Sequence, residues 1–137
     1  MPTFSHGKDT VFKVADNGAT FRDVSNVCDS SGLARSCDAA EVTSFGNQDK
    51  AYIAGLRDAT IPVTGFADPT VDGYFAGILG WATPVAWELY PMGSATGKIK
   101  YNGSAILTRY ESAPAVGDAV KVTGELQSTG AVTRAVL

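Results

Sequence analysis

The sequence is poor in the residues on which many enzymes, metal sites and nucleic-acid-binding proteins depend. Its 137 residues include one histidine, His6, and two cysteines, Cys28 and Cys37. The formal net charge is −3, with 11 Lys and Arg against 14 Asp and Glu, whereas tight phosphate binding draws on a surplus of cations. We therefore expect no specific DNA binding, and no histidine-based catalytic or metal site.

Long apolar runs are missing as well. No uninterrupted apolar stretch approaches the roughly 20 residues that a membrane-spanning helix needs. The N-terminal stretch MPTFSHGKDTVFKV lacks the basic region and apolar segment of an export signal. The sequence therefore predicts no membrane span and no secretion. In such a chain the two cysteines are expected to be free thiols rather than a disulfide.

The sequence contains no complete motif of the kinds that enzymes use. The stretch GSATGKI, from Gly93 to Ile99, has three residues between its glycines and an isoleucine where a phosphate loop needs a hydroxyl. No Gly-x-Ser-x-Gly motif occurs. The sequence thus predicts a protein that is not an enzyme and holds no cofactor or metal.

What the sequence has in quantity is hydrophobic alternation with a period of two, which is typical of half-buried strands. Lys98–Tyr110 predicts one long strand or two strands joined at Asn102-Gly103, where the dipeptide forms a hairpin turn or a bulge. Ser128–Gly130 predicts a turn between two further strands. The other alternating segments are Thr10–Val14, Thr60–Phe66, Val85–Tyr90, Ala119–Gln127 and Ala131–Leu137.

One segment has helical periodicity instead. Asp68 is a suitable N-cap, Pro69 suits the first helical position, and apolar residues follow at helical spacing up to Leu79. Within 16–44 we expect loops around a short turn at Arg22–Cys28 and a strand at Asp38–Ser44. The prediction is a single, mainly β domain over residues 1–137. It is a β-sandwich or partly closed barrel with one flanking helix.

A long loop is predicted at Phe45–Gly55, before the strand at Thr60–Phe66. Its apolar residues Phe45, Tyr52 and Ile53 would be costly to expose on a monomer. Two interpretations remain open at this point. Either the loop folds back and buries these residues on its own domain, or it contacts another molecule.

Five segments in order resemble the major tail tube proteins of long-tailed bacteriophages: HGKDTVF, AAEVTSFG, DKAYIAGLRDATIPVTGF, DPTVDGYFAGILG and VTGELQSTGAVTR. The resemblance runs from about His6 to Arg134. It implies a β-sandwich subunit with a flanking helix, six of which form a ring. The inner sheets would join into a β-barrel around a lumen, and the rings would stack into the tail tube of the virion. DNA would pass through the lumen during ejection without specific binding.

The resemblance also implies where subunits meet, because the family's inter-subunit loop corresponds to Phe45–Gly55. The candidate assembly residues are Phe45, Gly46, Asn47, Asp49, Lys50, Tyr52, Ile53 and Leu56. Implied partners are further copies of the chain and the tape-measure, tail-terminator and baseplate or tail-tip proteins. Synthesis and assembly would take place in the cytoplasm of the bacterial host.

The segment Ser25–Cys37 departs from the family pattern, because it contains both cysteines. If Cys28 and Cys37 faced each other across a hairpin, a disulfide would close a short loop. Free thiols remain the favoured prediction for the newly made protein.

Two other functions remain open. One is a monomeric β-sandwich binding module, for instance for carbohydrate, that stacks sugars on Trp81, Trp87 or Tyr90. The other is a virion decoration or tail-terminator protein, which would share the fold but not the endless stacking. Concentration-dependent formation of rings or filaments distinguishes a tube protein from a monomeric module.

Overall fold

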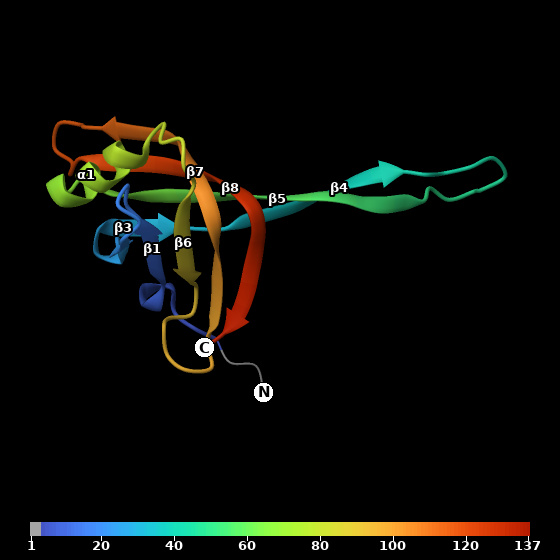
Figure 1. Ribbon diagram of the computed structural model, residues 1–137, viewed down its shortest axis with the longest axis horizontal. Coiled ribbons are helices and arrows are strands. Elements are labelled where there is room, and N and C mark those ends of the chain that lie inside the picture. The colour runs from blue at the N-terminus through green and yellow to red at the C-terminus, as the bar shows by residue number, and fades with distance from the viewer. Residues whose placement is uncertain (1–3) are drawn as a thin grey trace.

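The computed structural model describes residues 4–137, which form one α-helix and a single eight-stranded sheet (Figure 1). The strand order is β2-β1-β6-β7-β8-β5-β3, with β4 also paired to β5, and the paired strands are antiparallel. The helix is α1 (Pro69–Ile78) and two 3₁₀ turns span Gly7–Asp9 and Ser25–Val27. The strands are β1 (Val11–Ala15), β2 (Phe21–Asp23), β3 (Cys28–Ser31), β4 (Ala34–Glu41), β5 (Tyr52–Phe66), β6 (Val85–Tyr90), β7 (Ile99–Ala113) and β8 (Lys121–Val136).

The sheet curls around one apolar core, which confirms the mainly β class in its partly closed barrel form. Alternate residues of the strands supply the core because successive side chains point to opposite faces of a sheet. The helix covers this core with Val71, Phe75 and Ile78. The buried strand residues include Phe12, Val14, Ile61, Val63, Val85, Trp87, Leu89, Ala105, Leu107 and Leu126.

Helix α1 begins as predicted. The Asp68 side chain accepts a hydrogen bond from the Val71 amide at 3.1 Å, and Pro69 follows the cap. The helix ends at Ile78, one residue before the predicted end. From the sheet, Tyr110 stacks on Phe75 with ring centroids 5.4 Å apart.

A polar contact also links the helix to the sheet. The Tyr110 hydroxyl donates to Asp72 Oδ1 of α1 at 2.7 Å. Burial of the ring, reinforced by this carboxylate, raises the pKa of Tyr110. The phenol therefore stays protonated and remains a hydrogen-bond donor to Asp72 at neutral pH.

Strands β7 and β8 correct one prediction. β7 is a single strand whose register with β8 shifts between Asn102 and Ser104. Asn102-Gly103 therefore lies at a bulge and not at a hairpin turn. β8 is continuous through Ser128–Gly130, where a turn was predicted. Gly130 takes a φ of +80°, and the residues beyond it continue to pair with β7. The chain bends instead of reversing because β7 is long enough to pair with both halves of β8.

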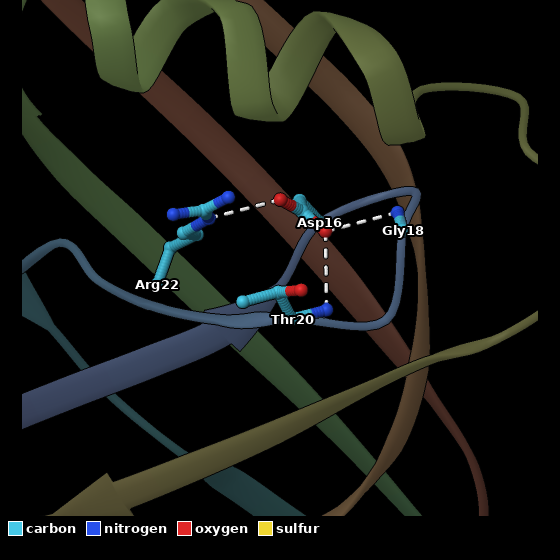
Figure 2. A network of polar contacts seen from close by, with 4 residues as sticks. All are labelled: Asp16, Gly18, Thr20 and Arg22. Carbon is cyan, nitrogen blue, oxygen red and sulfur yellow. Dashed lines mark hydrogen bonds and ion pairs between the residues drawn. The ribbon is translucent and has the colours of Figure 1, made fainter.

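Polar contacts around Asp16 hold the hairpin of β1 and β2 (Figure 2), and Arg22 braces the hairpin against the helix. Asp16 accepts hydrogen bonds from the Gly18 amide at 2.9 Å and the Thr20 amide at 3.1 Å. It also pairs with Arg22 Nε at 2.9 Å, and this contact contributes most to lowering the pKa of Asp16. The Arg22 guanidinium lies 5.0 Å from the centroid of the Tyr74 ring on α1. The predicted short turn at Arg22–Cys28 is thus the end of β2 followed by a 3₁₀ turn.

Candidate assembly surface

The most prominent feature is a two-stranded hairpin that projects from the body of the sheet (Figure 1). It consists of β4 and the first half of β5, paired from Ala34↔Thr60 to Glu41↔Tyr52. Every residue from 34 to 58 is exposed to solvent. We call residues 34–58 the arm.

The arm corrects the predicted boundaries. The loop at its tip comprises residues 42–51, so Tyr52–Gly55 belong to β5 rather than to the predicted loop Phe45–Gly55. β4 is Ala34–Glu41 instead of a strand at Asp38–Ser44. A ribbon exposed on both faces has no alternation between buried and exposed positions, and alternation is the sequence signal for a strand.

Each face of the ribbon carries a large apolar side chain. The pairs Ala40↔Ile53 and Glu41↔Tyr52 are adjacent rungs, so Ile53 and Tyr52 point to opposite faces. Tyr52 is 55% exposed and Ile53 56% exposed. The interpretation in which these residues fold back onto their own domain therefore does not describe the subunit.

The tip of the arm is held by its own hydrogen bonds. The Asn47 side chain donates to Ser44 Oγ at 3.1 Å, and the Ala51 amide donates to Thr43 Oγ1 at 2.9 Å. Gly46 takes a φ of +88°, a conformation that glycine adopts readily. Phe45 is fully exposed at this tip, close in sequence to Asp49 and Lys50. The structure thus brings all the predicted assembly residues onto the arm, with Leu56 nearer to the body.

A groove of about 740 Å³ lies where the arm leaves the body. The ladder between β5 and β8 ends at Thr60↔Gln127, and beyond this pair the two strands diverge. The Gln127 amide fills the fork by donating to Asp58 Oδ1 at 2.6 Å and to the Ala59 carbonyl at 3.1 Å. We call this hollow, lined by Arg35, Arg57 and residues 128–132 among others, the root groove. Sequence patterns gave no signal for it, because it depends on where two strands separate.

The two cysteines lie far apart. Cys28 pairs with Gly65 and Cys37 with Arg57 along β5, a separation of about 26 Å at roughly 3.3 Å per residue. A disulfide requires α-carbons less than about 7 Å apart, so this geometry excludes a bridge between them within one subunit. Cys37 is exposed, and burial raises the pKa of the Cys28 thiol to about 11.

The aromatic residues proposed for sugar stacking do not share a surface. Trp87 is fully buried and Tyr90 is 7% exposed, whereas Trp81 is 45% exposed. Within residues 4–137, no three His, Cys, Asp or Glu side chains gather into a possible metal site. His6 accepts a hydrogen bond from the Lys8 amide at 3.1 Å. No helix in the described part of the chain is long and apolar enough to cross a membrane.

Sequence comparison identifies the family to which this architecture belongs. The model of the phage tail tube protein family matches residues 5–134. The chain belongs to the phage tail tube protein family. This membership confirms the resemblance and makes the chain a structural protein of the tail tube. No curated protein is similar enough in sequence to be reported as a relative.

Solved structures of low sequence identity share the fold of this tail tube protein. A chain in the virion of a native gene transfer agent particle has a TM-score of 0.80 at 17% identity, covering 97% of this chain and 100% of that one. A chain of the SPP1 tail tube has a TM-score of 0.78 at 12% identity, covering 98% and 80%. A chain of the sheath–tube complex of the extracellular contractile injection system PVC has a TM-score of 0.72 at 13% identity, covering 100% and 95%.

Proposed function

We propose that six copies of this tail tube protein form a ring, and that rings stack into the tube through which DNA leaves the virion. The observation that carries the proposal is the arm, which exposes apolar side chains on both faces of a two-stranded ribbon. Such a ribbon is only marginally stable by itself in water. Contact with other copies would bury both faces and fix the arm in place.

The fold also supports ring closure. The β7-β8-β5-β3 portion of the sheet, which we call the wing, ends in short β3 on one side. On the other side, residues 108–113 of β7 pair with β8 but extend beyond both the β6 ladder and the bridge between Leu79 and Leu107. Unpaired strand edges readily pair with another chain. Joining unlike edges of successive copies is a heterologous contact, which generates a closed ring when the rotation is right.

In this arrangement the face of the wing opposite the core would line the lumen. Thr60, Thr64 and Glu125 lie on this face, across from the buried Ile61, Val63 and Leu126. Two cations on this face, Arg109 and Lys121, have neighbours within the subunit, and Arg109 forms an ion pair. Arg109 pairs with Glu111, and the Lys121 ammonium lies 5.9 Å from the centroid of the Phe66 ring.

Such a surface suits the passage of DNA without retention. A surface of hydroxyl, amide and carboxylate groups has few free cations that could bind phosphate. Contacts with phosphate dominate the affinity of proteins for DNA. The net charge of −3 for each chain gives about −18 for six copies, which repels a polyanion.

The remaining partners follow from the same role. A stacked tube has two ends, so we propose contacts with a tail-terminator protein at one end and with a baseplate or tail-tip protein at the other. We propose a tape-measure protein inside the lumen during assembly in the host cytoplasm. The similar chains in the baseplate of the anti-feeding prophage and in its tube-terminating cap support the contacts at the two ends.

Electron microscopy of the purified protein in negative stain, across a range of concentrations, tests the proposal. We expect tubes with a regular axial repeat and a central hole. Single rings that never stack would favour a terminator or decoration protein instead. Monomers at every concentration, including after addition of tube ends from virions as seeds, would contradict ring assembly.

A further inference from the structure

Unpaired charges of opposite sign are separated along the arm. Arg35 and Arg57 lie at its root, while Glu41 ends β4 near the tip and Asp49 lies in the tip loop. Three ion pairs are formed within residues 4–137, and none of them includes these four side chains. Asp58 also lies at the root, but the two arginines leave the lining of the root with a net positive charge, whereas Lys50 offsets only part of the acidic charge in the tip region.

The two arginines are close neighbours on one face. The pairs Arg35↔Ala59 and Cys37↔Arg57 place them diagonally across the ladder, where residues are about 7–8 Å apart. Both line the root groove, and the Arg35 guanidinium lies 5.7 Å from the centroid of the Tyr101 ring across the fork. Asp58 also lines this open groove of about 740 Å³ and accepts a hydrogen bond from Gln127, but the two arginines leave the lining with a net positive charge, which favours an acidic occupant.

The two acids near the tip of the same arm, Glu41 and Asp49, lie too far away to reach this groove. Glu41 lies opposite Tyr52, and Tyr52 is about 17 Å from Arg57 along β5 at roughly 3.4 Å per residue. The arm is a paired ribbon, so its tip cannot fold back without breaking the ladder. An ion pair between tip and root must therefore join two copies of the chain.

We propose that the root groove receives the tip of the arm of a second copy, with Glu41 and Asp49 of the incoming tip beside Arg57 and Arg35 of the groove. The inference rests on the proposed tube assembly and identifies the surface that receives the arm. Each copy has one tip and one groove, so the contact is directional. A directional contact of this kind can be repeated from copy to copy without limit.

Charge reversal tests the pairing directly. Glu41→Arg gives copies with a basic tip and a basic groove. Arg57→Glu gives copies with an acidic tip and an acidic groove, because Asp58 and the new carboxylate then outnumber Arg35 in the lining. We expect each single variant to raise the critical concentration for tube formation, measured by ultracentrifuge pelleting, by about tenfold or more. The double variant Glu41→Arg/Arg57→Glu should bring the critical concentration most of the way back to that of the parent protein.

Mixing the two single variants gives the sharpest comparison. An equimolar mixture should assemble well below the critical concentration of either variant alone, because each tip then meets a groove of opposite charge. Lys8→Glu, an exposed site outside the arm, makes the same change in net charge as Arg57→Glu and should leave assembly unchanged. Circular dichroism of each variant checks that the subunit is folded.

The possible outcomes separate the two proposals. If the parent protein forms no tubes, the proposed function fails. If the parent forms tubes and both single variants have the same critical concentration as the parent, the proposed contact between tip and groove is wrong. The contact is also wrong if the double variant and the mixture assemble no better than the single variants.

Discussion

Truncation of Ile53 is expected to weaken assembly without weakening the subunit. Ile53 lies on the arm and is 56% exposed in the isolated chain. Full burial of an isoleucine side chain is worth about 1.5–3 kcal/mol. Slightly more than half of this free energy is gained only when another copy covers the arm. Ile53→Ala should therefore weaken the free energy of the contact between copies by about 1–1.5 kcal/mol.

This loss has a measurable size. Because 1.4 kcal/mol corresponds to a tenfold change in an equilibrium constant, the critical concentration for tube formation should rise about five- to twelvefold. Pelleting over a dilution series measures this concentration. Thermal unfolding of the unassembled subunit should be unchanged, since the side chain makes little contact within it.

The same substitution eight residues along β5 provides the matched control. Ile61 is completely buried in the core, and Ile61→Ala should destabilise the subunit by about 2–5 kcal/mol. Its melting temperature should therefore fall while that of Ile53→Ala does not. An unchanged critical concentration for Ile53→Ala, or a fall in melting temperature comparable to that of Ile61→Ala, would refute the reasoning.

Three further predictions concern the subunit. Tyr110→Phe keeps the stacked ring but removes the hydrogen bond to Asp72, so the unfolding free energy should fall by about 1 kcal/mol; an unchanged denaturant midpoint would show that this bond contributes nothing. The lowered pKa of Asp16 means that its contribution to stability is present above the unfolded-state pKa and is lost as pH falls through the folded-state value. Thermal melts between pH 6 and 2 should therefore show a smaller acid-induced loss for Asp16→Asn than for the parent, and equal losses would count against the brace. Iodoacetamide at pH 8 should modify Cys37 much faster than Cys28, whose burial raises its pKa to about 11, and mass spectrometry showing equal rates would contradict the burial of Cys28.

The elements that could be predicted from the sequence are those whose residues meet a buried surface. Val85–Tyr90 has the alternation of a half-buried strand and is strand β6 with the same ends. Helix α1 combines an N-cap at Asp68 with apolar residues at helical spacing, and both signals are local. Its predicted end was one residue too late, an error of the size expected for fraying helix ends.

The elements that could not be predicted depend on partners distant in sequence. Ser128–Gly130 has the composition of a turn, but β7 continues alongside and holds β8 in one bent strand. The arm has no buried face, so its strands lack the alternation that marked the others. Its role was suggested by three exposed apolar residues and by the family resemblance. Arg35 and Arg57 became candidates only when the register placed them on one face beside a groove.

Helical reconstruction by cryo-electron microscopy of tubes formed from the purified protein tests the central claim most directly. We predict six subunits in each ring, the face of the wing that carries Thr60 and Glu125 toward the bore, and the arm of each subunit packed against another copy with both of its faces covered. Tubes in which residues 34–58 lie free in solvent, or in which the wing faces outward, would contradict the account.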